Sequence, residues 1–363
     1  MVSLAKLEVI DFRSFSKSTF EFNPSGTTVL LGENGTGKTS VIEAVAFLGS
    51  GNSFRGTARD LMIRSGCERS VLRADVLAGE RRLLVEGQIQ LGVGSYFQIN
   101  RQATRSATRL SEAIPVVIFS PDDLELVQGG PGKRREYLDR CVTLVDPLMS
   151  SVLADFEKVL RQRATLLRQS AGRPTPEILS TLDVWDERLG DLGNAVVAAR
   201  AELVEQLNPY VKDAYSSFAG RSGGAVEMRY KTTWTPPLRD ALATSRREDI
   251  KRGVNTTGPH RDELDLELNG RLLRSQASQG EQRCMALSLK LGFYQMVVEK
   301  TSTVPILLLD DVFSELDPLR SEALMNWLPV GQSIVTTSTP LPGCDERGPK
   351  GNLSVQLISA LDQ

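Results

Sequence analysis

The chain has 363 residues, with 43 lysines and arginines against 45 aspartates and glutamates, so its formal net charge is -2. A hydrophobic fraction of 40% and a charged fraction of 24% are ordinary for a globular protein of one or two domains. No run approaches the ~18 consecutive apolar residues of a membrane helix, and the cysteines form no C-x-x-C pair. This composition argues against a membrane-spanning, exported or disulfide-framed protein, so we expect a cytoplasmic one.

The first segments alternate apolar and polar residues, as strands do. We predict a hairpin from residues 7–10 and 19–22, followed by a strand at residues 27–31. Arg13 lies in the connection of the hairpin, where it could approach a nucleotide. A solvated loop arginine is the alternative interpretation of Arg13.

The stretch GENGTGKTS satisfies the pattern G-x-x-x-x-G-K-[ST] between a strand-like and a helix-like segment. Such a loop turns backbone N–H groups toward phosphate oxygens, while Lys38 would reach the β- and γ-phosphates and Thr39 would ligate Mg²⁺. The alternative is a glycine turn before a buried helix. We predict that ATP and Mg²⁺ bind here, in contact with Gly32, Glu33, Asn34, Gly35, Thr36, Gly37, Lys38, Thr39 and Ser40.

A dense series of arginines follows the helix after this loop. Contact with a nucleic-acid backbone is one explanation for such a series, and a solvated basic face is the other. The series consists of Arg55, Arg59, Arg64, Arg69 and Arg73. The same region continues with strand-like segments at residues 71–76, 83–89, 95–99 and 114–119.

After Gly129 and Gly130, apolar residues recur every three or four positions, which is typical of helices. We predict two antiparallel helices, residues 133–173 and 177–213, which form a short arm because some forty residues span ~60 Å at most. Strand signals then resume at residues 264–268, before an Asn-Gly turn. The predicted parts are a first head part at 1–128, a helical lobe at 129–250 and a second head part at 251–363.

Two later stretches carry further chemical signals. Ser278 and Glu281 have the S-x-x-E spacing of a capping box, so the helix that starts there is either plainly capped or offers its end to an anion. Residues 304–311, VPILLLDD, form an apolar strand that ends in two carboxylates. Asp310 would hold the Mg²⁺ shell through water, and Asp311 would orient or deprotonate the water that attacks the γ-phosphate.

The order GENGTGKT, SQGEQR, ILLLDD and SELD resembles the ABC-type ATPase heads of SMC-like proteins. FRSF, FSPDDLELVQGGPGKRREYLD, TGPHRDEL and LLLDDVFSELD further resemble the RecF family of bacterial repair proteins over nearly the whole chain. The resemblance implies an α/β fold, in which an ABC-type ATPase head is made from the N- and C-terminal parts and carries an inserted helical lobe. It also implies an ATP-dependent homodimer.

Roles follow from the resemblance position by position. Gly32 to Thr39 match the Walker A loop, Asp310 matches the Walker B carboxylate, and Ser314 to Asp317 match a loop exchanged across the dimer. The matching signature residues, which would cap the γ-phosphate from the second subunit, are Ser278, Gln279, Gly280 and Gln282.

This sequence also departs from the pattern of such heads. Asp311 stands where they usually have a glutamate, and Thr337 stands where they have a histidine, so we predict slow hydrolysis that serves as a timer. No glutamine ends the strand at residues 114–119, where Asp122 or Asp123 could substitute.

By resemblance, the partners are double-stranded DNA at gaps or at junctions of double and single strands, together with RecR, RecO and RecA. Contacts with DNA should be mainly to phosphate, because no helix-turn-helix, zinc finger or aromatic series is found. The candidate contacts are Arg55, Arg59, Arg64, Arg134 and Arg135. His260, in TGPHRDE, is either a structural histidine or a residue near the nucleotide or the dimer face.

Three other classes compete with this interpretation. A transporter subunit would have its signature much closer to the phosphate loop than Ser278 is to Lys38, and a chromosome-scale tether needs a longer arm. A non-catalytic assembly module that nucleotide merely locks stays open, and a turnover assay with and without DNA separates it from the ATPase.

Overall fold

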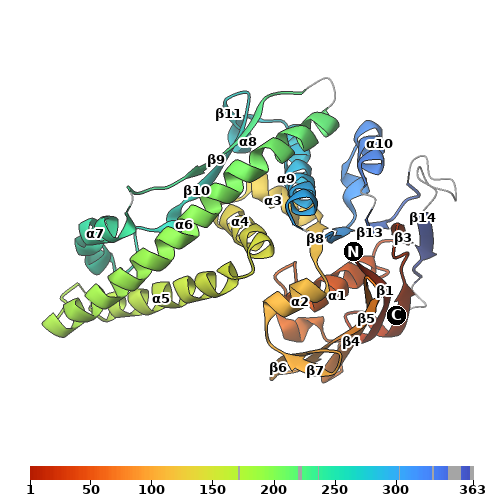
Figure 1. The fold of residues 1–363 in the computed structure, drawn as a ribbon, viewed down its shortest axis with the longest axis horizontal. Coiled ribbons are helices and arrows are strands. Elements are labelled where there is room, and N and C mark those ends of the chain that lie inside the picture. The colour runs from red at the N-terminus through yellow and green to blue at the C-terminus, as the bar shows by residue number, and fades with distance from the viewer. Residues whose placement is uncertain are drawn as a thin grey trace. The chain divides into compact units, whose positions relative to one another are not determined.

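The computed structural model describes residues 1–170, 172–219, 223–235, 237–301, 303–328, 331–341 and 353–359. The chain forms two compact units, whose elements are drawn in Figure 1. Unit 1 consists of Met1–Asp123, Ser217–Arg221 and Leu287–Gln363, and unit 2 of Leu124–Ser216 and Ser222–Ala286. Residues 251–286 therefore lie with the helical lobe and not, as the predicted division had it, with the second head part. The cause is that β10 (Glu263–Leu268) pairs with β9 (Val226–Lys231) of unit 2.

Unit 1 contains an antiparallel sheet in the order β2-β1-β4-β5-β6-β7. Its strands alternate between buried and more exposed residues, which is why the alternation in the sequence located most of them. The short β7 was not predicted. The strands are β1 (Val2–Phe12), β2 (Phe15–Glu21), β4 (Arg69–Ala78), β5 (Arg81–Gln90), β6 (Gly94–Ile99) and β7 (Gln102–Thr104).

A parallel sheet in the order β14-β3-β13-β12-β8 lies in the same unit. All four residues of β12 are buried, as expected of a central strand in a parallel sheet. The carboxyl ends of neighbouring parallel strands share one edge of the sheet, so the residues that follow β3 and β12 are brought to the same edge. The strands are β3 (Thr27–Leu31), β8 (Val116–Phe119), β12 (Ile306–Leu309), β13 (Ser333–Thr337) and β14 (Leu353–Leu357).

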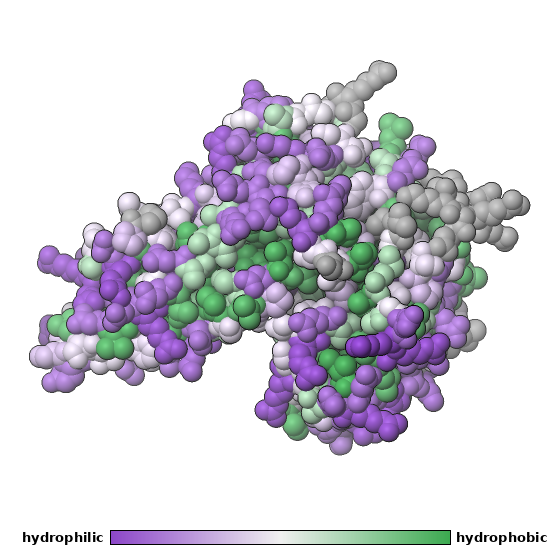
Figure 2. Space-filling model, in the orientation of Figure 1, coloured by the Kyte–Doolittle hydropathy of each residue, from purple (hydrophilic) through white to green (hydrophobic). Residues whose placement is uncertain are grey.

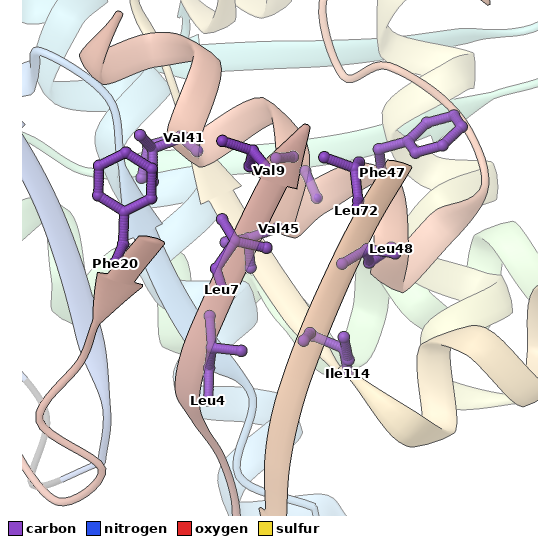
Figure 3. Close-up of a cluster of buried hydrophobic side chains, with 14 of the residues drawn as sticks. Leu4, Leu7, Val9, Phe20, Val41, Val45, Phe47, Leu48, Leu72 and Ile114 are labelled. Carbon is purple, nitrogen blue, oxygen red and sulfur yellow. The ribbon is translucent and has the colours of Figure 1, made fainter. Parts of the chain in front are cut away.

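Helix α1 (Lys38–Ser50) is buried along most of its length. Figure 3 shows side chains of β1, β2, β4 and α1 gathered in one apolar cluster, among them Leu7, Phe20, Val45 and Phe47. Burial of such a side chain contributes about 1.5–3 kcal/mol. The start of α1 is thereby held firmly beneath the loop that precedes it.

The remaining helices of unit 1 are α2 (Ala107–Ala113), most of α9 (Gln279–Lys300) and α10 (Pro318–Trp327). Helix α10 has Pro318 at its first turn, and the carboxylate of Asp317 accepts a hydrogen bond from the Arg320 N–H at 2.9 Å. Helix α9 begins in unit 2 and enters unit 1 at Leu287. Its predicted start near Ser278 is confirmed.

Unit 2 contains a small antiparallel sheet, in which β10 lies between β9 and β11 (Arg271–Leu272), and several helices. The turn Asn269-Gly270 has positive φ at both residues, 52° and 73°, as a two-residue hairpin of this kind requires. The helices are α3 (Glu125–Gln128), α4 (Pro131–Val145), α5 (Met149–Gln169), α6 (Pro176–Ala219), α7 (Leu238–Arg252) and α8 (Leu273–Gln276).

The predicted helix at residues 133–173 is wrong as a single element. The chain breaks at Asp146, which is extended with φ -126° and ψ 94°, and resumes as α5. Pro147 explains the break, because the ring disfavours helical geometry in the residue before it. The predicted second helix is confirmed as α6, which runs past Pro209 to Ala219.

A buried ionic cluster joins α5, α6 and α7 in unit 2. The guanidinium of Arg163, which is 0% exposed, donates to Asp186 at 2.5 Å, to Asp249 at 2.7 Å and to Asn255 at 2.7 Å. Hydrophilic side chains predominate on the visible surface over α7 and the adjoining end of α5 (Figure 2). The lobe is held together by this internal cluster and by a separate core of buried apolar side chains from α5, α6 and α7.

Two expectations from composition concern the whole chain. Across the described residues, no helix is both long and apolar enough to span a membrane. The three cysteines within those residues, Cys67, Cys141 and Cys284, form no disulfide, and Cys344 lies outside them.

Candidate nucleotide-binding site

The loop between β3 and α1 has the backbone of a phosphate-binding loop. Gly35 and Gly37 have φ of 87° and 89°, values that favour glycine. A Cβ atom at Gly37 would lie 2.5 Å from the ring of Phe15, so a larger residue has no room there. At the base of the loop, the Gly32 N–H donates to the carbonyl of Thr337 at 3.3 Å, which ties the loop to β13.

Lys38 begins α1 and folds back over the loop. Its Nζ donates to the carbonyl oxygens of Gly32 and Glu33, both at 2.7 Å, and the residue is 7% exposed. Burial lowers the pKa of Lys38, and the nearby charges of Asp311 and Asp310 act to raise it. An ammonium group held this way can turn to phosphate oxygens when they replace the two carbonyls.

The carboxylate of Asp310 meets the start of α1 at the shared edge of the sheet. Its Oδ1 accepts hydrogen bonds from the hydroxyls of Thr39, at 2.9 Å, and Thr336, at 2.8 Å. Burial raises the pKa of Asp310, and the two hydroxyls and the charge of Arg55 act in the opposite direction. The structure therefore places the loop threonine and the strand carboxylate, 271 positions apart, in direct contact.

Asp311 adopts a left-handed conformation with φ 49°. Its N–H donates to the hydroxyl of Thr336 at 2.9 Å, while its Oδ1 is buried without a hydrogen-bond partner among the described residues. A buried carboxylate oxygen without a partner is costly, and such costs accumulate at functional sites. This oxygen can therefore accept a hydrogen bond from a ligand or from water.

The oxygens at this edge suit Mg²⁺. Mg²⁺ prefers hard oxygen ligands and usually takes one or two of them from protein, keeping waters and substrate phosphates for the rest of its shell. Thr39 and Asp310 supply such a pair, and Asp311 adds the buried oxygen without a partner. These side chains would hold the ion.

The last strand of the site differs from the expectation in detail. The hydroxyl of Thr337 donates to the Thr339 carbonyl at 2.8 Å, and the hydroxyl that reaches the carboxylate of Asp310 is that of Thr336. Thr336 bridges the two aspartates because it accepts from one and donates to the other. The strand ends in two threonines whose hydroxyls could reach the phosphates, and the sequence did not distinguish Thr336 from Thr337.

Arg13 lies at the connection of the hairpin, but its guanidinium is bound to protein. It forms two hydrogen bonds with the carboxylate of Glu43, at 2.7 and 2.8 Å, and others with the Leu61 carbonyl and the Thr57 hydroxyl. Glu43 is fully buried on α1. The predicted direct contact between the Arg13 side chain and nucleotide is therefore replaced by a contact with the helix of the phosphate loop.

The signature segment lies in unit 2 at the start of α9. The hydroxyl of Ser278 donates to the Glu281 carboxylate at 2.7 Å and accepts from the Glu281 N–H at 3.3 Å, which confirms the capping box. Ser278 and Gln279 are exposed, and Gly280 is partly exposed. Gln282 differs from them because it is buried, with its amide bound to Gln128 and to the Leu273 carbonyl within unit 2. Its role is therefore structural and not, as predicted, contact with nucleotide.

Of the predicted DNA contacts, those in unit 1 are accessible. Arg55 and Arg59 are exposed, and Arg64 forms a long ion pair of 3.5 Å with Asp11. Arg55 lies close enough to Asp310 to affect the pKa of that carboxyl.

The two predicted contacts in unit 2 need correction. Arg134 is 4% exposed and binds both oxygens of Glu263, so it cannot contact DNA. Arg135 is partly buried and donates to the Asp262 carbonyl at 2.8 Å. Both arginines hold α4 to β10 and to the residue before it. The sequence alone does not distinguish such buried arginines from solvated ones.

Asp123 and His260 also have structural surroundings. Asp123 accepts from the Ser120 N–H and forms a 2.9 Å ion pair with Lys290, so it is not placed as a substitute for a metal-linked glutamine. Asp122 is exposed. Burial lowers the pKa of His260 to about 4, and its Nε2 lies 3.1 Å from the Asn255 carbonyl. His260 is therefore neutral at physiological pH, as a structural histidine would be.

A phosphate loop and an acidic strand end at the edge of a parallel sheet, with an added antiparallel sheet and a helical lobe, define an ABC-type ATPase head of the SMC-like class. The model of the RecF/RecN/SMC N-terminal domain matches residues 3–339, and the chain belongs to this family.

Relatives of this chain are found along its length. It is 38% identical over 348 residues to the DNA replication and repair protein RecF of Acidothermus cellulolyticus, covering 92% of this chain and 93% of the relative. It is 37% identical over 348 residues to the RecF protein of Streptomyces avermitilis, covering 92% of each.

Solved structures show the same fold. The recombination mediator protein RecF-ATPrS in the RecFOR pathway superimposes with a TM-score of 0.86 at 28% identity, covering 99% of this chain and 96% of that one. The Smc head domain from Pyrococcus furiosus, bound to the C-terminal domain of ScpA, has a TM-score of 0.54 at 15% identity, covering 93% and 90%. The second likeness concerns the fold alone. The predicted fold class is confirmed.

Proposed function

We propose that this protein is an ATP-dependent DNA-binding repair protein. Two copies would close around ATP, bind duplex DNA at gaps or at junctions of double and single strands, and release it after slow hydrolysis. With RecR and RecO, the complex would promote loading of RecA in recombinational repair and the SOS response. The proposal is supported by the family of the chain and by relatives named for replication and repair.

The observation that carries the nucleotide part is the contact between the Thr39 hydroxyl and the Asp310 carboxylate. Bound Mg²⁺ would neutralise phosphate charge. Lys38 would bind the β- and γ-phosphates, and the loop N–H groups would orient them. Asp311 would position the attacking water and accept its proton at the carboxylate oxygen that has no partner among the described residues.

The dimer part rests on the signature segment. Ser278 and Gln279 are exposed at the start of α9, where the helix end attracts an anion and the Ser278 hydroxyl can exchange the Glu281 carboxylate for it. We infer that this end caps the γ-phosphate held by the other subunit, so that ATP bridges two heads. Gln282 supports the segment from within.

The test is the molecular mass in solution, measured by light scattering with ATP, with ADP and without nucleotide. We expect ATP alone to convert monomer to dimer, and Lys38→Met and Ser278→Arg to abolish the conversion. The matched control is Ser151→Arg on α5, because Ser151 is exposed. Ser321→Arg would not serve as a control, because Ser321 is buried. If the molecular mass does not change with ATP, or if Ser278→Arg dimerises normally, the proposed site shared by two subunits is overturned.

A second candidate is the non-catalytic assembly module. It is favoured by Asp311, whose side chain is shorter than the glutamate usual in ABC-type heads. Turnover of ATP with and without duplex DNA decides between the two, because the module predicts dimerisation without phosphate release.

A further inference from the structure

The connection between β1 and β2 is strained. Only Arg13 and Ser14 lie between the paired residues Phe12 and Phe15. Arg13 has φ 54° and Asp11 has φ 48°, a left-handed conformation that residues with a Cβ rarely adopt. Such strain persists where the surroundings over-determine it, and it is frequent at functional sites.

The contacts of Arg13 supply that constraint. Its N–H donates to the Met62 carbonyl at 2.8 Å, and its guanidinium binds both carboxylate oxygens of Glu43. The remaining donors reach Leu61 and Thr57, at 2.9 and 3.0 Å. One side chain thus joins the turn, the helix that starts at Lys38, and the segment that follows this helix.

Glu43 binds the same segment from its other end. The Ser53 hydroxyl donates to its carboxylate at 2.5 Å and accepts from the Arg55 N–H at 3.2 Å. Farther along, the Arg64 N–H donates to the Asp11 carbonyl at 2.9 Å. We call residues 52–64 the arginine segment, because it carries Arg55, Arg59 and Arg64.

The turn also touches the phosphate loop. The Phe15 ring and the Ser14 hydroxyl lie 2.5 and 3.1 Å from the point where a Cβ atom at Gly37 would stand. The Ser14 hydroxyl is buried and has no hydrogen-bond partner among the described residues. A shift of the loop on phosphate binding would therefore press on the turn, and a shift of the first turn of α1 would be carried along the helix to Glu43.

We propose that Arg13 and Glu43 form a positioning pair that transmits nucleotide occupancy of the phosphate loop to the arginine segment. The link itself requires only nucleotide binding. Its consequence for DNA rests on the proposed function, in which the arginine segment contacts phosphate. Neither residue touches the reacting atoms, so both act through the segment they hold.

The test is hydrogen–deuterium exchange with and without saturating ATPγS and Mg²⁺. The variant is the double substitution Arg13→Met with Glu43→Met, which leaves no unpaired buried charge. The control is Arg73→Met, which breaks two ion pairs, with Glu8 and with Glu86, on the antiparallel sheet. Arg13→Lys is a milder second variant that keeps the charge and loses the two-pronged contact.

In the unchanged protein, we expect ATPγS to slow exchange at residues 32–40 and in the arginine segment. In the double variant, only residues 32–40 should respond, Arg13→Lys should show a reduced response of the segment, and Arg73→Met should behave normally. A double variant that does not fold, judged by circular dichroism, leaves Arg13→Lys to decide. An arginine segment that responds equally in the variants, or never responds, overturns the inference.

The same samples distinguish failure of the two proposals. If residues 32–40 do not respond in the unchanged protein, nucleotide binding fails and the inference falls with it. If they respond while the arginine segment does not, the inference alone fails. If the segment responds but ATPγS does not strengthen binding to duplex DNA by at least ~10-fold, a change of about 1.4 kcal/mol, the link stands and the DNA function fails.

Discussion

The ionic cluster of unit 2 and the two aspartates at the site of unit 1 treat buried charge in opposite ways. In unit 2, Arg163 lies between the carboxylates of Asp186 and Asp249, so opposite charges meet inside the lobe. In unit 1, Asp310 has hydroxyls as its partners and Asp311 keeps one buried oxygen without any described partner. Buried charge that is balanced internally holds helices together, whereas buried charge that is left unbalanced prepares a place for a ligand.

The largest expected effect is in unit 2. Arg163→Met should destabilise the protein by about 3–5 kcal/mol, because it leaves the carboxylate of Asp249 buried without its cation, although Asp186 keeps its ion pair with Arg246. Urea unfolding followed by circular dichroism measures this. The control, Arg161→Met, removes an exposed pair with Glu157 and should change stability by less than ~0.5 kcal/mol. Equal effects of the two variants would contradict the internal role of the cluster.

Lys38→Met should act on binding instead of folding. Loss of the ammonium from the phosphates should weaken ATP about 100-fold, or ~2.7 kcal/mol, measured by titration calorimetry. Because burial lowers the pKa of Lys38, its charge is a burden on the ligand-free fold, and the variant should be at least as stable. The exposed Lys17→Met on β2 is the control. A variant that unfolds readily would show that Lys38 serves structure first.

A smaller effect tests the unbalanced carboxylate. Asp310→Asn should stabilise the ligand-free protein by ~1 kcal/mol near neutral pH. Burial raises the pKa of this carboxyl in the fold, so its ionised form costs stability, and that cost disappears as pH falls through the raised value. Thermal unfolding across the pH range should therefore show a gain that vanishes in acid. A gain in stability that does not change with pH would mean that the charge of Asp310 is not its cause. The control is Asp122→Asn, which should bring no gain in stability because Asp122 is exposed.

The smallest expected effect on stability is that of Arg59→Ala, at most ~0.5 kcal/mol, because the side chain is exposed. Its binding to duplex DNA should weaken a few-fold, and the slope of log affinity against log salt should fall by about 1. Fluorescence anisotropy over a salt series measures both. An unchanged slope would remove Arg59 from the proposed DNA contact and leave it a solvated arginine.

The particular errors at the site share one cause. Arg134 and Gln282 lie in segments whose family resemblance suggested ligand contact, yet each is buried against partners of its own unit. The sequence did not distinguish Thr336 from Thr337 and gave no signal for Glu43, although Thr336 bridges the two aspartates and Glu43 anchors the arginine segment. In each case the residue whose contact sets the role lies elsewhere in the chain. Residue type and spacing therefore do not reveal that contact.

The sequence by itself determined the local features of this protein. Glycines at Gly35 and Gly37, the alternation in the strands and the S-x-x-E spacing at Ser278 act over a few residues, so the backbone at each place follows from its own segment. Only the tertiary structure decided which side chains meet. The contact of Thr39 with Asp310 and that of Arg13 with Glu43 depend on how strands and helices pack, because the carboxyl ends of parallel strands and a buried helix bring together residues that the chain keeps apart.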